Sequence, residues 1–96
     1  MIIYGFGTDI VNIDRIKKII KRNKDFKKRI FSVQEISICD KKRNSYAYYA
    51  KKYAAKEAFS KALGIGISKG LSFNEIEILN DKKGKPIVNL KKNTKI

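Results

Sequence analysis

The stretch YAYYAKKYAAKEAFSKAL, residues 46–63, decides the fold. Its alanines, at positions 47, 50, 54, 58 and 62, recur every three or four residues and therefore line one face of an α-helix. Tyrosines follow a neighbouring face, and Gly64 can end the helix in the left-handed conformation. The sequence thus predicts a long helix that packs closely along its small side chains.

Shorter elements are expected on the N-terminal side of this helix. Ile2 to Phe6 is apolar and interrupted by glycine, which predicts a short buried strand. Isoleucines spaced three and four apart from Ile13 onward, with cations between them, predict an amphipathic helix. Ser32-Val33-Gln34-Glu35 matches a capping box, so we expect a further short helix that ends near Asp40.

A hairpin is expected on the C-terminal side. Residues 73–79 alternate between apolar and polar side chains and predict a strand. Residues 80–84 predict a turn, and Pro86 opens a second strand, Ile87 to Leu90. Three short strands can therefore pack against the alanine-lined helix, which predicts an α+β fold in one domain, residues 1–96.

Composition excludes several classes of protein. The chain has 96 residues, of which 43% are hydrophobic and 33% charged, enough for one small globular domain. No apolar run reaches the roughly 18 residues of a membrane span, and no secretory leader is expected. The single cysteine, Cys39, and the absence of histidine exclude disulfide frameworks, histidine-dependent catalysis and histidine-ligated zinc. We expect a protein of the reducing cytoplasm.

The net charge of +14 would attract nucleic acid, anionic lipid or an acidic protein. Because 19 of the 23 cations are lysine, the position of the charge is more informative than its total. Residues 15–29 hold nine cations and one acid, a local charge of 9 − 1 = +8. No RNP-like pattern of aromatics accompanies these cations, which argues against a nucleic-acid-binding protein and favours a docking face for an acidic protein.

Two carboxylates are candidates for chemistry. Asp9 follows a glycine-broken strand, and Glu57 lies on the long helix beside closely packed alanines. Carboxylates without histidine favour a hard cation such as Mg²⁺, which commonly completes its shell with water and phosphate. The alternatives are a helix-capping Asp9 and a surface pair between Glu57 and Lys61. The glycines after the helix and the turn at Gly84 are, by themselves, ordinary loop features.

Several motifs together resemble the holo-acyl-carrier-protein synthase family of short, single-domain 4'-phosphopantetheinyl transferases. They are GFGTDIV (5–11), Arg15, YAAKEAFSKALGIGI (53–67), LSF (71–73) and GKP (84–86), and the match runs in order from residue 2 to about residue 90. The resemblance implies a small antiparallel sheet packed on a long helix. It also implies transfer of the phosphopantetheine arm of coenzyme A to a serine of apo-acyl carrier protein, with release of 3',5'-ADP, in support of fatty acid biosynthesis.

The resemblance also implies roles for individual residues. Asp9 and Glu57 occupy the Mg²⁺-ligand positions, and Glu57 and Lys61 are the catalytic candidates; the base is either Glu57 or a metal-bound water. Residues matching the family's coenzyme A surroundings are Lys52, Lys56, Ser60, Lys61, Gly64, Gly66, Gly84, Lys85 and Pro86. Residues falling where the family's first helix meets the acidic carrier protein are Arg15, Lys18, Ile19, Arg22 and Arg29.

The chain departs from the family at its C-terminal end. Family members are typically homotrimers with active sites between subunits, and they continue into a histidine-containing strand and a final strand. This chain ends at Ile96 with neither. We therefore expect the topology to hold through residue 90, but assembly and transfer by the chain alone to be impaired. A carrier-binding module without catalysis and a small nucleic-acid-binding protein are the alternatives.

Overall fold

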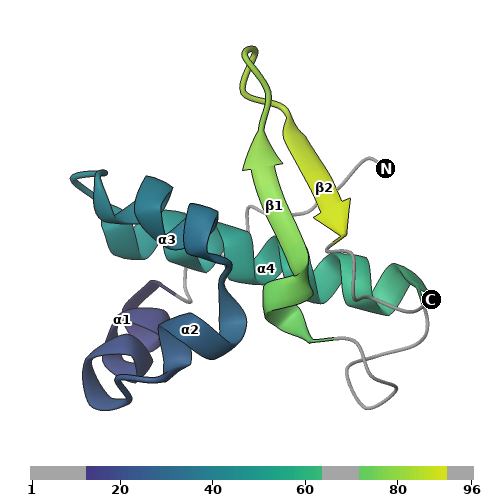
Figure 1. The fold of residues 1–96 in the computed structure, drawn as a ribbon. Coiled ribbons are helices and arrows are strands. Elements are labelled where there is room, and N and C mark those ends of the chain that lie inside the picture. Colours follow the sequence, from purple (N-terminus) through teal and green to yellow (C-terminus); the bar gives the residue numbers. More distant parts are fainter. Residues whose placement is uncertain (1–12, 64–71, 91–96) are drawn as a thin grey trace.

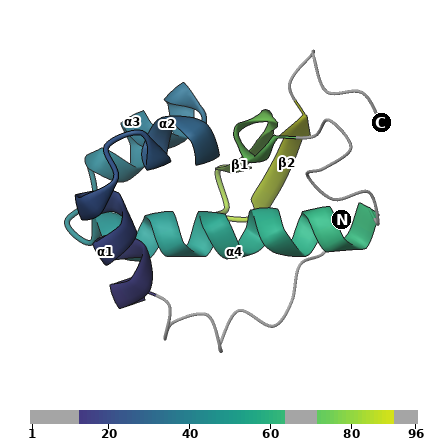
Figure 2. The same ribbon diagram turned by 90° about the horizontal axis from the view of Figure 1, so that it is seen from below.

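The computed structural model describes residues 13–63 and 72–90, and its longest element is the helix α4, Ser45–Leu63. The predicted long helix is thereby confirmed. Helices α2 and α3 and a β-hairpin lie along the same side of α4, while α1 packs near its N-terminal half (Figures 1 and 2). The predicted α+β class is confirmed. None of the helices in these two ranges is long and apolar enough to cross a membrane.

Three shorter helices precede α4: α1, Ile13–Arg22; α2, Phe26–Ile30; and α3, Val33–Asp40. The amphipathic pattern of α1 is confirmed, because Ile16 is buried while the cations between the isoleucines remain largely exposed. The capping box of α3 is also confirmed. The Ser32 hydroxyl accepts from the Glu35 amide at 3.2 Å, and Glu35 Oε1 accepts from the Ser32 amide at 2.8 Å.

The hairpin consists of β1, Ile76–Asn80, and β2, Pro86–Leu90, paired antiparallel with Ile78 opposite Val88. The prediction that the first strand begins at Phe73 is wrong. Residues 73–75 form one turn of 3-10 helix, η3, in which Glu75 Oε1 accepts from the Ser72 amide at 3.0 Å. This local cap satisfies a backbone donor without a partner strand, so it favours the turn over extended backbone.

The core consists of two apolar clusters along α4. The first joins α1, the segment between α2 and α3, α3 and the start of α4 through Ile16, Phe31, Cys39, Tyr49 and Ala50. The second joins the later part of α4 to the hairpin through Ala55, Phe59, Ile76 and Ile78. The predicted alanine face is only partly covered by the described residues, since positions 54 and 58 are half-buried and position 62 is exposed.

Polar side chains connect the two clusters. Glu35, Lys56 and Glu77 have no exposed surface, and Lys52 and Ser32 are nearly as buried. Glu77 lies on β1, where the sequence alternates between polar and apolar side chains, yet it is fully buried. Its carboxylate accepts from the Ser32 hydroxyl at 2.5 Å and from the Asn89 amide at 3.1 Å. Ser32 comes from a distant segment and Asn89 from the paired strand β2, and both donate to a carboxylate whose burial without hydrogen bonds would be costly.

Four predictions lie outside the described residues. They concern the strand Ile2 to Phe6, the metal ligand Asp9, and the nucleotide-binding glycines Gly64 and Gly66.

Candidate functional site

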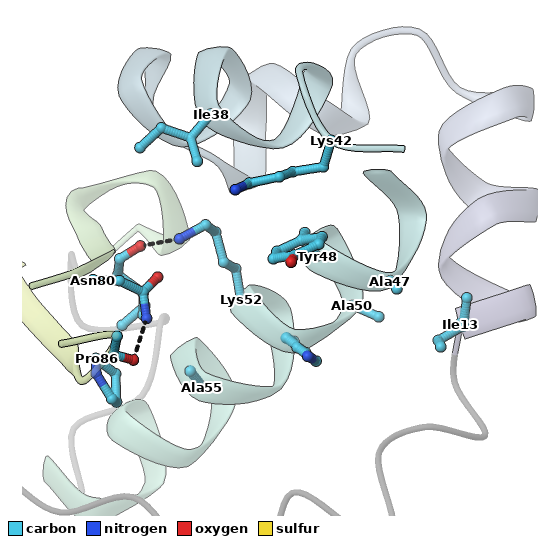
Figure 3. Close-up of a pocket in the computed structure, with 13 residues that line it drawn as sticks. Ile13, Ile38, Lys42, Ala47, Tyr48, Ala50, Lys52, Ala55, Asn80 and Pro86 are labelled. Atoms are coloured by element: carbon cyan, nitrogen blue, oxygen red, sulfur yellow. Dashed lines mark hydrogen bonds between the residues drawn. The ribbon is translucent and has the colours of Figure 1, made fainter. Parts of the chain in front are cut away.

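A cavity of about 740 Å³ opens between α3, α4 and the hairpin turn (Figure 3). Lys52 lines it from α4, and Gly84 and Pro86 line it from the turn and β2. These are three of the positions predicted to contact coenzyme A. The structure therefore brings together residues that lie more than thirty positions apart in the sequence, whereas Lys85, between Gly84 and Pro86, is exposed and does not line the cavity.

The turn that carries Gly84 is organised by one aspartate. Asp81 Oδ1 accepts from the backbone amides of Lys83 at 2.9 Å and Lys85 at 2.8 Å, and the Asn80 side chain donates to the Gly84 carbonyl at 3.0 Å. Gly84 has a φ of 85°, a conformation that side-chain-bearing residues rarely adopt. The turn residues predicted from the sequence thus form one edge of the cavity, and these hydrogen bonds define the conformation of the turn.

The cavity lining is cationic and partly aromatic. The ammonium groups of Lys42 and Lys51 lie 5.2 and 5.4 Å from the centre of the Tyr48 ring, which is partly exposed. Lys52 is 5% exposed and donates to the Ile78 carbonyl oxygen, and its side chain and that of Lys42 extend into the same space (Figure 3). None of the described lining residues is acidic. Such a cavity suits a ligand with a flat apolar group and negative charge.

Sequence analysis missed Lys42, Tyr48 and Lys51 as possible ligand contacts. Lys42 lies in the polar segment 41–45 between two predicted helices, and Tyr48 is one of several tyrosines on the long helix. Only the packing of α3 against α4 places the Lys42 amine over the Tyr48 ring. The i, i+3 spacing of Tyr48 and Lys51 was a local indication of their contact.

A different side of α4 carries Glu57 and Lys61. Glu57 is half-buried, Lys61 is exposed, and Ser60 is 7% exposed. Among the described residues, no hydrogen bond or ion pair engages the Glu57 carboxylate, and no group of three potential metal ligands occurs. One available carboxylate still fits Mg²⁺, which usually takes one or two protein carboxylates and retains water.

Lys56, one residue before Glu57, has another environment. Its amine lies 2.6 Å from Glu35 Oε1 and donates to the Phe73 carbonyl at 2.8 Å, and both side chains of the ion pair are 0% exposed. Burial lowers the pKa of the Lys56 ammonium, and the Glu35 carboxylate opposes this effect. The predicted contribution of Lys56 to coenzyme A binding stays a prediction, because its amine contacts protein acceptors here.

Tyr53 connects the surroundings of Glu57 to α1. Burial raises the pKa of the Tyr53 hydroxyl, the nearby Glu57 carboxylate raises it further, and the Arg15 guanidinium of α1 opposes them. Tyr53 also packs edge-on against Phe73, with ring centres 5.5 Å apart. Tyr53, four residues before Glu57, also packs against the core cluster that contains Ile16 of α1, so α1 lies beside this part of α4.

The α1 surface carries the predicted docking residues. Arg15, Lys18, Arg22 and Arg29 are exposed, and Ile19 is half-buried. Four of these residues, at positions 15, 18, 19 and 22, belong to α1. They are spaced three or four residues apart and therefore share one face of the helix. The structure thus presents a cationic surface with an apolar side chain in it.

A family model described as the 4'-phosphopantetheinyl transferase superfamily matches residues 5–96. The chain belongs to this superfamily. A holo-[acyl-carrier-protein] synthase of Vesicomyosocius okutanii is 52% identical over 85 residues, covering 88% of this chain and 67% of the relative. One from Blochmanniella pennsylvanica is 51% identical over 89 residues, covering 92% and 71%. The chain thus spans about two thirds of the length of these relatives.

Solved structures show the same fold. A holo-(acyl-carrier-protein) synthase from Bacillus anthracis in complex with CoA (3',5'-ADP) has a TM-score of 0.70 at 38% identity, covering 82% of this chain and 68% of its own. The Helicobacter pylori enzyme in complex with coenzyme A has a TM-score of 0.69 at 43% identity, covering 84% and 69%. The predicted fold family is confirmed.

Proposed function

We propose that this chain transfers the 4'-phosphopantetheine group of coenzyme A to a serine of apo-acyl carrier protein, giving holo-acyl carrier protein and 3',5'-ADP. The reaction would take place in the cytoplasm in support of fatty acid biosynthesis. The observation that carries the proposal is the convergence of Lys52, Gly84 and Pro86 on one cationic cavity. Two structural relatives, both similar to this chain over more than 80% of its length, are described with coenzyme A or its nucleotide product.

The cavity is proposed to hold the nucleotide end of coenzyme A. The Tyr48 ring offers an aromatic surface for a base, and Lys42, Lys51 and Lys52 offer positive charge for phosphate groups. Lys52 has a hydrogen bond to a carbonyl oxygen and, among the described residues, no carboxylate partner. Its positive charge is therefore available to an anionic ligand.

Glu57 and Lys61 are proposed to act at the group that is transferred. Mg²⁺ held by Glu57 and Asp9 would neutralise the diphosphate and stabilise the leaving 3',5'-ADP. Lys61, exposed near the end of α4, would stabilise charge on the transferring phosphoryl group, and the neighbouring Ser60 would help to position it. The nucleophile is the serine of the carrier, and Glu57 is the candidate base within this chain.

The carrier is proposed to dock on α1. Cations at positions 15, 18 and 22 would attract an acidic carrier and orient it, and Ile19 would add an apolar contact. Because α1 packs against α4 and Tyr53, four residues before Glu57, lies against the cluster that contains Ile16, a carrier on this surface would place its serine near Glu57.

Lys52 and Glu57 of one chain face different directions. They are five residues apart on α4, which is about 140° around a helix of 3.6 residues per turn. A nucleotide in the cavity of one chain would thus lie away from Glu57 of that chain. This separation supports a site shared between copies, as in the homotrimers that the family resemblance implies.

The test is to incubate the chain with coenzyme A, Mg²⁺ and apo-acyl carrier protein and then to weigh the carrier. We expect the carrier to gain the mass of one phosphopantetheine arm. Lys52→Met should raise KM for coenzyme A, whereas Lys82→Met, an exposed lysine of the turn, should not. Carrier binding without a gain in mass would favour the non-catalytic module, and tight, salt-sensitive retention of RNA or DNA would favour the nucleic-acid alternative.

A further inference from the structure

The buried ion pair between Lys56 and Glu35 directly precedes Glu57 on α4. Lys56 Nζ lies 2.6 Å from Glu35 Oε1, and neither side chain has exposed surface. The Glu57 carboxylate, by contrast, has no hydrogen bond or ion pair among the described residues. Within the described part of the chain, the direction of the Glu57 carboxylate is therefore not set by a hydrogen bond or an ion pair of its own.

Both members of the pair are held at several points. Glu35 Oε1 also accepts from the Ser32 amide at 2.8 Å, and Glu35 Oε2 accepts from the Ile78 amide of β1 at 2.7 Å. The Lys56 amine also donates to the Phe73 carbonyl of η3 at 2.8 Å and lies 5.4 Å from the centre of the Phe31 ring. One ion pair thus connects α4 to α3, to η3 and to the outer edge of β1.

This connection restrains the rotation of α4 about its own axis. Consecutive helical residues project about 100° apart, so a fixed direction for Lys56 also sets the direction in which Glu57 leaves the helix. An apolar side chain at position 56 could be buried equally well, but it would allow α4 a range of rotations about its own axis. Buried ion pairs contribute little net stability compared with apolar packing, and a defined geometry is their better-supported benefit.

We propose that Lys56, held by Glu35, is a positioning residue that fixes the orientation of the Glu57 carboxylate toward its ligand. This rests on the proposed function, in which Glu57 holds Mg²⁺ beside the diphosphate. It differs from a direct role of Lys56 in coenzyme A binding, because the Lys56 amine is fully enclosed and engaged by protein oxygens. Residues that support a metal-binding carboxylate typically change metal affinity or activity by about 10–100-fold when replaced.

The test compares Lys56→Met, which retains the apolar stem, with Glu35→Gln/Lys56→Met, which leaves no unpaired charge. Lys27→Met is the matched control, because it removes the amine of the other ion pair, Lys27–Asp40, which is exposed and connects α2 to α3. Thermal unfolding followed by circular dichroism first identifies a temperature at which every variant is folded. Calorimetry then measures Mg²⁺ binding in the presence of coenzyme A, with Glu57→Gln as the reference for loss of the ligand, and carrier mass measures transfer.

We expect both Lys56 variants to lower Mg²⁺ affinity and kcat by about 10–100-fold with KM for coenzyme A nearly unchanged, and Lys27→Met to match wild type in Mg²⁺ affinity and in KM for coenzyme A. Lys56→Arg, which keeps the charge but displaces its head group, should fold and fall between wild type and Lys56→Met. Wild-type Mg²⁺ affinity and kcat in these variants, or a rise in KM for coenzyme A alone, would overturn the positioning role.

Failure of the proposed function is recognised separately. A wild-type chain that binds Mg²⁺ through Glu57 but does not modify the carrier would contradict transfer, while calorimetry on the Lys56 variants would still decide the positioning role. A wild-type chain that binds no Mg²⁺ with coenzyme A present would overturn both.

Discussion

Removing one partner of the Lys56–Glu35 pair should destabilise the whole domain. Both side chains are 0% exposed, so the remaining charge would stay buried without its counterion. Such a loss costs about 3–5 kcal/mol. A domain of this kind has only about 5–15 kcal/mol of stability in total. A single substitution at position 35 or 56 should therefore remove a large fraction of the free energy of unfolding.

The structure also predicts which substitution costs more. Lys56→Met leaves the Glu35 carboxylate with two backbone donors, the amides of Ser32 and Ile78, so its cost should lie near 3 kcal/mol. Glu35→Gln turns an amide –NH₂ toward one of these donor groups and leaves the Lys56 ammonium unpaired, so its cost should lie near 5 kcal/mol. The double variant buries neither charge and should be less destabilised than the sum of the singles, with a coupling energy of up to about 3 kcal/mol.

Urea unfolding of wild type, the two single variants and the double variant measures this coupling. The slope of the free energy against urea should stay constant while the midpoint falls by more than about 1 M in each single variant. The control cycle is Lys27→Met with Asp40→Asn, a pair with side chains 32% and 48% exposed that should couple by only about 0–1 kcal/mol. A cost below about 1 kcal/mol for Lys56→Met, with an unchanged slope, would refute the argument that this charge is held in the interior.

Three further outcomes follow from the same structure. Charge reversal at Arg15 and Arg22, which are both exposed, should raise KM for the carrier, while calorimetry should show that this variant binds coenzyme A nearly as wild type does. Added salt should raise KM for the carrier in wild type. Burial raises the pKa of the Cys39 thiol to about 11, so a thiol reagent at pH 8 should react only as fast as the protein unfolds; immediate modification would contradict this burial. A hydrogen bond from the Tyr49 hydroxyl at 2.7 Å lowers the pKa of the Asp40 carboxyl below its usual 3.8. The stability it contributes is therefore present above about pH 4 and lost as pH falls through the lowered pKa; urea midpoints should show a smaller acid loss in Asp40→Asn than in wild type.

Most of the backbone could be predicted from the sequence because local patterns control it. Isoleucine spacing predicted α1, the capping box predicted the start of α3, and the turn residues after Asn80 predicted the hairpin. The errors also have local causes. Helix α2 has only five residues and three cations, too few for a periodic pattern, and the Ser72–Glu75 cap replaces strand with 3-10 turn where the side chains alternate.

The buried charges could not be predicted in the same way. The i, i+4 spacing predicts a surface pair of Glu57 with Lys61, but it contains no information about Glu35, which is 21 residues before Lys56. The same holds for Glu77, whose serine partner Ser32 is 45 residues away. The capping box did indicate that Glu35 bonds a backbone amide. Only the docking of α3 against α4 and β1 shows that the carboxylate also accepts from Lys56 and Ile78.

Two lysines that look equivalent in the sequence have different roles because they contact different groups in the folded protein. Lys52 and Lys56 are one helical turn apart, both nearly fully buried, and both were assigned to coenzyme A on family resemblance. Lys56 faces a carboxylate, so its charge is neutralised within the protein and serves to orient the helix. Lys52 faces a carbonyl oxygen at the wall of the cavity, so its charge remains available to a phosphate. One turn of α4 can thus carry both a charge that attracts a ligand and a charge that orients the helix. Lys52 has the first role because it donates to the Ile78 carbonyl of β1. Lys56 has the second role because it pairs with Glu35, which also accepts from the Ile78 amide.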